Sequence, residues 1–254
     1  MSHKLNDITL YYHPSDDSAK KFTMKQNLIS DLYVNFLTGY KPPKTSRISV
    51  TLCSKDSIQF YSGSILMVDA FFNKDQFWKL NDREQNIVIL DTIHRVALLC
   101  VEKYHWNKAV FEQAYDKVLK ADFNYEIEGI LKSSKNRQHK ASVLLKKNEL
   151  FSTIFAVFYD NEGKKIKTVE LLKSFPHAMF YGGILNNYKW FNNSEFGIYS
   201  SGEELSIRAS LENDLSETVI KPKLKEKEVI EGILRSITYR QLSDERDFVE
   251  WANG

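Results

Sequence analysis

The chain has 254 residues, of which 43% are apolar and 27% are charged, which is ordinary for a globular protein and long for a single domain. Its formal net charge of only +2 disfavours both a general nucleic-acid binder and an acidic nucleic-acid mimic. Residues 1–10 lack the apolar core of a secretory signal, and the most apolar stretch, residues 87–101, is too short and too charged to span a bilayer. We therefore expect a cytoplasmic protein with no membrane partner, in which Cys53 and Cys100 are buried, reduced thiols.

The first eighty residues predict a mixture of strands and one helix. An alternating pattern predicts a strand over residues 8–12, and apolar residues at helical spacing predict a helix over residues 28–37. Alternating segments separated by turn residues predict an antiparallel meander over residues 48–72.

Two further helices are predicted before residue 122. Asn81 or Asp82 is placed to cap the first, which is apolar on most sides from residue 87 to residue 99 and should therefore be buried by neighbours. Asn107 is placed to cap the second, whose apolar face runs through residues 110–119.

The hydrophobic period changes near Asn124, and residues 125–211 predict a succession of strands. Residues 151–159 are apolar on both faces, as in a strand covered on both sides, and Asp160–Gly163 has the composition of a hairpin turn. A short C-terminal helix with Ser243 as its cap ends the chain. The fold class is thus α+β, with antiparallel sheets packed by about four helices in a single domain over residues 1–254. An alternative subdivision near residue 124 separates a mixed α/β part from a β-rich part.

No motif in the chain indicates a metal, a cofactor or a catalytic residue. The six histidines lack zinc-ligand spacing, and His94 is expected to be a core residue of its helix. The acidic pair Asp16–Asp17 is the best of a weak set of candidate metal ligands, but turn formation and helix capping are the favoured explanation.

A basic run without acidic residues leaves three interpretations open. It is followed by further lysines that an antiparallel sheet would bring close. Lysines of this kind protect a solvated edge strand, bind an acidic protein or neutralise phosphates. The residues are Lys132, Lys135, Arg137, Lys140, Lys146 and Lys147, followed by Lys164, Lys165 and Lys167.

The segment from Tyr181 to Asn193 is the strongest candidate for a binding site. It combines aromatic rings with asparagines and glycines, a composition that suits recognition of a protein partner. The alternative is a long turn whose aromatic side chains tuck into the sheet. Tyr188 and Trp190 are the expected anchors. The candidate partner-binding residues are Tyr181, Tyr188, Lys189, Trp190, Phe191, Asn192 and Asn193.

These observations favour a non-enzymatic, cytoplasmic protein that binds another protein, in its sharpest form an immunity protein that blocks a bacterial toxin. A hydrolase or nuclease is the rival. Its site would need His13 or His177 to converge with Asp16 or Asp160 in three dimensions. A nucleic-acid-binding accessory module is the third hypothesis, and it requires the two lysine runs to share one face.

Overall fold

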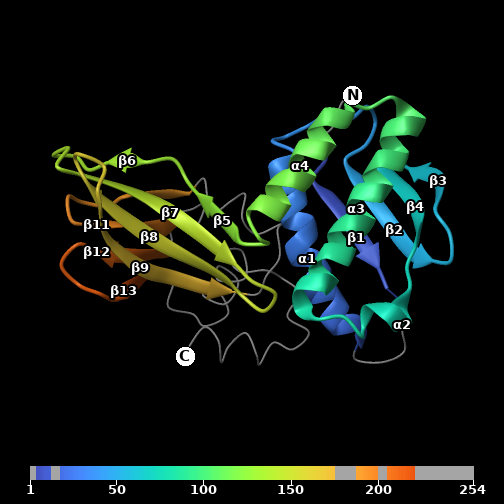
Figure 1. The fold of residues 1–254 in the computed structure, drawn as a ribbon. Helices are drawn as coiled ribbons and strands as arrows, with labels where there is room; N and C mark the ends of the chain where they lie inside the picture. Colours follow the sequence, from blue (N-terminus) through green and yellow to red (C-terminus); the bar gives the residue numbers. More distant parts are fainter. Residues whose placement is uncertain (1–3, 13–17, 175–186, 200–204, 221–254) are drawn as a thin grey trace. The chain divides into compact units, whose positions relative to one another are not determined.

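The computed structural model describes residues 4–12, 18–174, 187–199 and 205–220 (Figure 1). Within these ranges the chain forms four helices and three sheets in which antiparallel pairs predominate, so the predicted α+β class is confirmed. The chain divides into two compact units, residues 1–125 and 126–254, next to the change of period at Asn124. That these units make up a single domain stays a prediction. No helix in the described ranges combines the length and the apolar content that a bilayer crossing requires.

The sheet of residues 1–125 has the strand order β1-β2-β4-β3. β1 is parallel to β2, and β2 is parallel to β4, whereas β3 is antiparallel to β4. The strands are β1 (Asp7–Tyr11), β2 (Arg47–Cys53), β3 (Ser57–Ser62) and β4 (Ile65–Phe71).

The predicted meander over residues 48–72 is therefore wrong in its strand order, although its strands are present. β4 lies beside β2, with Val50 opposite Val68, and β3 lies on the outer side of β4. The turn that leads from β3 into β4 contains Gly63, whose φ is 61°. Burial explains the order. β4 places fully buried Leu66 in the sheet's centre, whereas β3 leaves Phe60 62% exposed and so suits the edge.

Four helices accompany this sheet, and the predicted caps are confirmed. Asn81 Oδ1 accepts a hydrogen bond from the Glu84 N–H at 3.0 Å, and Glu84 accepts one from the Asn81 N–H at 2.9 Å. Asn107 Oδ1 accepts from the Ala109 N–H. The helices are α1 (Ser18–Phe36), α2 (Lys74–Phe77), α3 (Asp82–Tyr104) and α4 (Lys108–Lys120).

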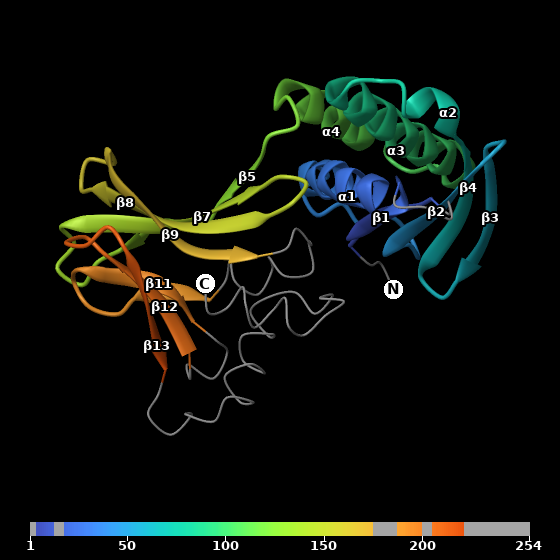
Figure 2. The same cartoon turned by 90° about the horizontal axis from the view of Figure 1, so that it is seen from below.

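The helices α1, α3 and α4 lie on one side of the sheet (Figure 2). The sheet face toward them carries Ile8, Ile48 and Val68, each at most 1% exposed. Burial of each such side chain contributes about 1.5–3 kcal/mol to folding. The opposite face is mixed, with Ile65 and Met67 in register with polar side chains and Arg47 paired to Asp7 at 2.9 Å.

The prediction that α3 is buried on nearly all sides is only partly correct. Ile89, Ile93 and Val96 are fully buried, but Leu98 and Leu99 are half-buried. The helix packs against α1, α4 and β4. No neighbour among the described residues fully covers the side that carries Leu98 and Leu99, so the apolar sequence is not matched by burial on every side.

Residues 126–254 contain two antiparallel sheets, one with the path β5-β7-β8-β9 and β6 beside β7, the other with the order β10-β11-β12-β13. The predicted hairpin between β8 and β9 is confirmed, with Gly163 at a φ of 90°. The C-terminal helix expected at Ser243 lies outside the described residues. The strands are β5 (Tyr125–Glu128), β6 (Lys132–Ser133), β7 (His139–Lys147), β8 (Ser152–Asp160), β9 (Lys165–Ser174), β10 (Tyr188–Trp190), β11 (Glu195–Tyr199), β12 (Leu205–Ser210) and β13 (Ser216–Ile220).

The two sheets pack face to face around an aromatic core. The Phe158 ring of β8 lies 5.7 Å from the Trp190 ring and 6.2 Å from the Phe196 ring, measured between centroids, with the rings edge to face. Tyr188 joins the same group at 5.8 Å from Phe196. These contacts make the described residues between 126 and 220 a β-sandwich.

Candidate functional site

The described part of the aromatic segment, residues 187–193, forms β10 and the turn into β11. Alternation along the strand directs Tyr188 and Trp190 into the sandwich and Lys189 away from it. Tyr188 is only 2% exposed and Trp190 only 8%. We therefore correct the interpretation of these two rings: they are core side chains, as in the alternative in which the aromatics tuck into the sheet. Tyr181 lies outside the described residues.

The polar atoms of both buried rings donate hydrogen bonds to backbone carbonyls in the segment between β5 and β7. The Tyr188 hydroxyl donates to the Ile130 carbonyl at 2.8 Å, and Trp190 Nε1 donates to the Lys132 carbonyl at 2.8 Å. Lys132 Nζ in turn donates to the Tyr188 carbonyl at 2.6 Å and lies 4.1 Å from the centre of that ring. Lys132 thus holds the two sheets together, a role that its place in a basic run did not reveal.

The outward side chains of the second sheet form a cation–aromatic cluster, which we define as Lys189, Phe191, Glu195, Tyr199 and Arg208. The Arg208 guanidinium lies 4.0 Å from the Phe191 ring centre, and Lys189 Nζ lies 4.7 Å from that of Tyr199. Arg208 also pairs with Glu195 at 3.4 Å. Glu217 lies opposite Arg208 in the register, so Lys189 and Arg208 share this face with two carboxylates. Lys189 and Phe191, both expected site residues, belong to this cluster.

Gly197 makes the cluster compact. It lies between Lys189 and Arg208 in the strand register, so no side chain separates the two cations. A Cβ atom at this position would stand 2.0 Å from the Ile207 carbonyl oxygen. Only glycine therefore lets β12 approach β11 this closely.

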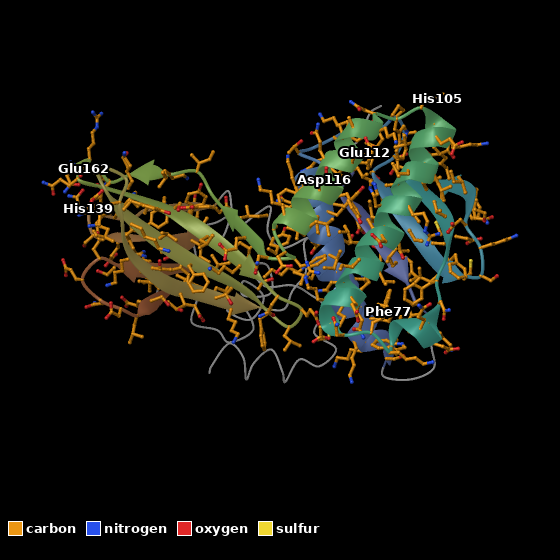
Figure 3. The ribbon with its side chains drawn as sticks, in the orientation of Figure 1. Phe77, His105, Glu112, Asp116, His139 and Glu162 are labelled. Carbon is orange, nitrogen blue, oxygen red and sulfur yellow. The ribbon has the colours of Figure 1, made fainter. Side chains whose placement is uncertain are left out.

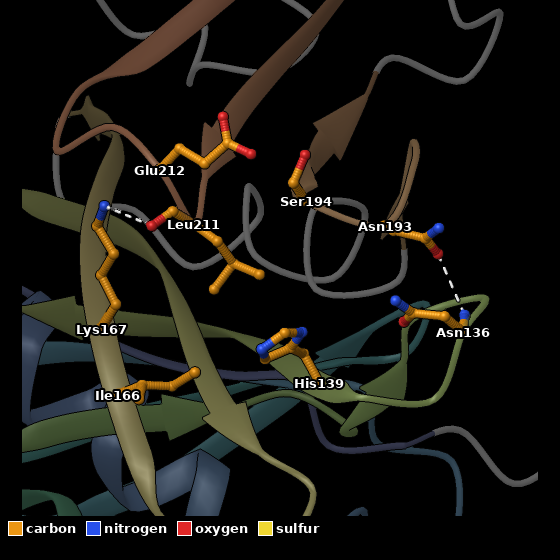
Figure 4. A pocket seen from close by; sticks show the side chains of 8 residues that line it. All are labelled: Asn136, His139, Ile166, Lys167, Asn193, Ser194, Leu211 and Glu212. Carbon is orange, nitrogen blue, oxygen red and sulfur yellow. Dashed lines mark hydrogen bonds between the residues drawn. The ribbon is translucent and has the colours of Figure 1, made fainter.

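A cleft of about 620 Å³ opens at one end of the sandwich, next to the β10–β11 turn (Figure 4). Turns of both sheets contribute to it, together with the first residues of β7 and β9. It brings together a ring nitrogen, amides, a hydroxyl, a carboxylate and two aliphatic side chains. The lining residues are Asn136, His139, Ile166, Lys167, Asn193, Ser194, Leu211 and Glu212.

One polar atom in this cleft lacks a partner. His139 Nδ1 is buried and has no hydrogen bond to any of the described residues. A buried ring nitrogen left without a partner costs folding free energy. The backbone N–H of His139 is held by the Ser134 hydroxyl at 3.1 Å, which fixes the start of the strand.

Two other cleft residues hold loops in place. Asn193 Oδ1 accepts from the Asn136 N–H at 3.1 Å and ties the β10–β11 turn to the β6–β7 turn. Lys167 Nζ donates to the carbonyls of Leu211 and Asn213, at 3.2 and 2.6 Å, and pairs with Asp214. The cleft is therefore preorganised by contacts within its own unit. Asn192 caps the same turn by accepting from neighbouring N–H groups and is exposed.

The basic run does not form one patch. Lys146 pairs with Glu126 at 2.6 Å, and Lys140 donates to the Asn161 carbonyl. Lys140 and Lys146 of β7 share one sheet face with Lys165 of β9, whereas Lys132 and Lys167 lie on the other face. The edge-strand interpretation fits β9, at the end of its sheet, but is wrong for β7, which lies between neighbours.

The remaining candidates show no converging active site within the described residues. His94 is half-buried, with Nδ1 3.0 Å from the Tyr33 hydroxyl, and burial lowers its pKa, which suits a structural role. His13, Asp16 and His177 lie outside the described residues. Among those described, no group of three or more His, Cys, Asp or Glu side chains could hold a metal ion.

Comparisons of the chain with family models, with curated proteins and with solved structures found no match.

Proposed function

We propose that this chain is a non-enzymatic, cytoplasmic protein that binds another protein through the end of its β-sandwich. The observation that carries the proposal is the cleft beside Asn193, whose wall combines amides, a hydroxyl and a carboxylate with the aliphatic side chains of Ile166 and Leu211. A polar side chain of a partner that enters this cleft would find hydrogen-bonding groups on its wall. Interface hot spots have this character, with one residue desolvated in a pocket and surrounded by contacts that exclude water.

The surroundings of the cleft support a protein partner. Ile166 at its wall is 50% exposed and Leu215 in the adjoining β12–β13 turn is 82% exposed, so apolar surface is available for burial. The cation–aromatic cluster lies on the sheet that supplies the β10–β11 turn. Arginine and aromatic residues are enriched at interface centres. Lys189 and Arg208 are the cations that acidic side chains of a partner would meet on this face, and complementary charge orients a complex.

Purification of the tagged protein from its host, followed by titration of the recovered partner against defined variants, tests this proposal. The double variant Lys189→Glu with Arg208→Glu should reduce affinity at least tenfold, and His139→Ala should reduce it by about three- to tenfold. Lys20→Glu with Lys21→Glu is the matched control, since both lysines are exposed on α1 and the charge change is the same. Equal losses of affinity in both double variants would show a general charge effect and would exclude the cation–aromatic cluster as the binding site.

In its sharpest form the proposal is an immunity protein that blocks a bacterial toxin. Co-expression of this chain with a toxin encoded next to its gene should restore growth of the producing cells. The Lys189→Glu, Arg208→Glu variant should fail to do so, while the α1 control should protect fully. Protection by both variants would place the toxin contact elsewhere.

One observation favours a second candidate, a hydrolase or nuclease. His139 and Glu212 line the same cleft, and a histidine with a carboxylate is the pairing that general acid–base catalysis uses. Incubation of the protein with plasmid DNA, total RNA and a chromogenic ester tests it. Turnover that His139→Ala and Glu212→Gln both abolish would establish the enzyme. Turnover unaffected by both variants, or none at all, would leave the cleft as a binding site.

A further inference from the structure

The open side of α3 carries a groove that the proposed function does not use. A hollow of about 420 Å³ lies along α3 with Tyr115 of α4 at its wall, and Leu98 and Leu99 contribute apolar surface. A second hollow of about 240 Å³, lined in part by Val88, adjoins it, and the two share Asp91 and Arg95. We call this surface, from Val88 to Glu102, the α3 groove.

The wall of the α3 groove is held in one arrangement. The Tyr115 ring lies 4.5 Å from the His94 ring, and its hydroxyl donates to Asp91 Oδ1 at 2.7 Å. That hydrogen bond raises the pKa of Tyr115 to about 12, so the donor stays protonated. His94 is fixed from beneath by Tyr33. A binding partner would therefore meet a preformed surface and lose little free energy in ordering it.

The charge around the α3 groove is negative. Asp91 and Glu102 line it, and Asp116 of α4 is close enough to His94 to raise the pKa of that ring by its charge. None of these three carboxylates pairs with a cation among the described residues. The two nearest cations are already neutralised, Arg95 by Asp56 and Lys108 by Glu112. Figure 3 shows Glu112 and Asp116 on α4.

We propose that the α3 groove binds a cationic amphipathic helix of a partner protein. The apolar side chains of that helix would cover Leu98, Leu99 and Tyr115, and its lysines or arginines would reach Asp91, Glu102 and Asp116. Fourteen residues of α3 separate Val88 from Glu102, a rise of about 21 Å, which matches a helix of about four turns. An apolar groove with an acidic rim is the complement of such a helix. This surface belongs to residues 1–125 and is independent of the sandwich site.

The test uses the full chain and two synthetic 18-residue probes. One combines leucine with lysine at helical spacing, and the other replaces every lysine by glutamate. Fluorescence anisotropy should show binding of the lysine peptide, weakening as salt rises, and no binding of the glutamate peptide.

Charge-reversed variants then locate the binding. Glu102→Lys with Asp116→Lys should weaken the lysine peptide at least fivefold. The matched control, Glu162→Lys with Glu170→Lys, changes the net charge equally on exposed residues of the other unit and should leave affinity unchanged. Equal losses in both double variants, or equal binding of both peptides, would overturn the proposal.

The double variant Leu98→Ser with Leu99→Ser distinguishes the proposed partner helix from a second copy of this chain as the occupant of the α3 groove. Loss of peptide binding by a variant that still melts cooperatively supports the proposal. Dissociation of a dimer by the same variant, seen in sedimentation, would show instead that a second copy of this chain fills the α3 groove. If the leucine variant does not fold, the comparison of the Glu102→Lys, Asp116→Lys variant with its control decides whether the α3 groove binds the lysine peptide.

Discussion

The two units present hollows of opposite character. The α3 groove in residues 1–125 is apolar, with carboxylates at its rim, whereas the cleft and the cation–aromatic cluster in residues 126–220 combine amides and a histidine with two cations. The difference does not lie in the net charge of the units, because residues 1–125 and residues 126–254 are each close to neutral in sum. What differs is which charged side chains gather at each hollow, and that arrangement rather than net charge bears on the partners.

The sandwich core offers the largest expected effect. Trp190→Ala should lower the free energy of unfolding by about 3–5 kcal/mol, because a buried aromatic ring and its hydrogen bond to the Lys132 carbonyl are both lost. Phe191→Ala, one residue further along the same segment, should cost under about 1 kcal/mol. Urea unfolding followed by circular dichroism compares them. Similar losses in the two variants would contradict the assignment of alternate residues to core and surface.

Gly197 gives the next largest effect. Gly197→Ala should destabilise the sandwich by about 1–3 kcal/mol, since the new methyl group would collide with the β12 backbone. Gly163→Ala is not a neutral comparison because of its positive φ, so Ser210→Ala, in the neighbouring strand, serves as the control. Unchanged melting of Gly197→Ala would mean that β11 and β12 can separate without cost.

His94 makes the stability of residues 1–125 depend on pH. Burial lowers its pKa, so the unfolded chain binds a proton more readily than the folded one, and stability falls as pH drops below about 6.5. His94→Asn, whose amide can still accept from Tyr33, should flatten this part of the profile. Unfolding free energies between pH 5 and 8 measure the difference. An unchanged slope in the variant would assign the dependence to other groups.

The smallest expected effect is that of a chelator. No described group of side chains has the make-up of a metal site, so melting temperatures with and without EDTA should agree. A fall of several degrees on chelation would reveal ligands that the described residues do not supply.

Local patterns predicted the local elements of this protein well. Asn81 and Asn107 were recognisable as helix caps because a cap depends on residues three or fewer positions away. The hairpin at Asp160–Gly163 was predictable for the same reason. Each of these features is decided by neighbours in the sequence.

The position of β4 between β2 and β3 was decided by long-range pairing, which the alternation of a strand leaves open. The same holds for the candidate site. The composition of residues 181–193 singled out a recognition segment, but whether Tyr188 or Lys189 faces outward depended on where the second sheet packs. His139 and Lys132 carried no distinguishing signal, because their roles arise from residues more than fifty positions away, such as Asn193 and Tyr188. The sequence by itself determined the type of most elements, the caps of α3 and α4 and the change from helices to strands at Asn124, but it missed α2 and the first ten residues of α1. Only the tertiary structure decided which side chains were buried and which were brought together, because those outcomes depend on contacts between distant segments.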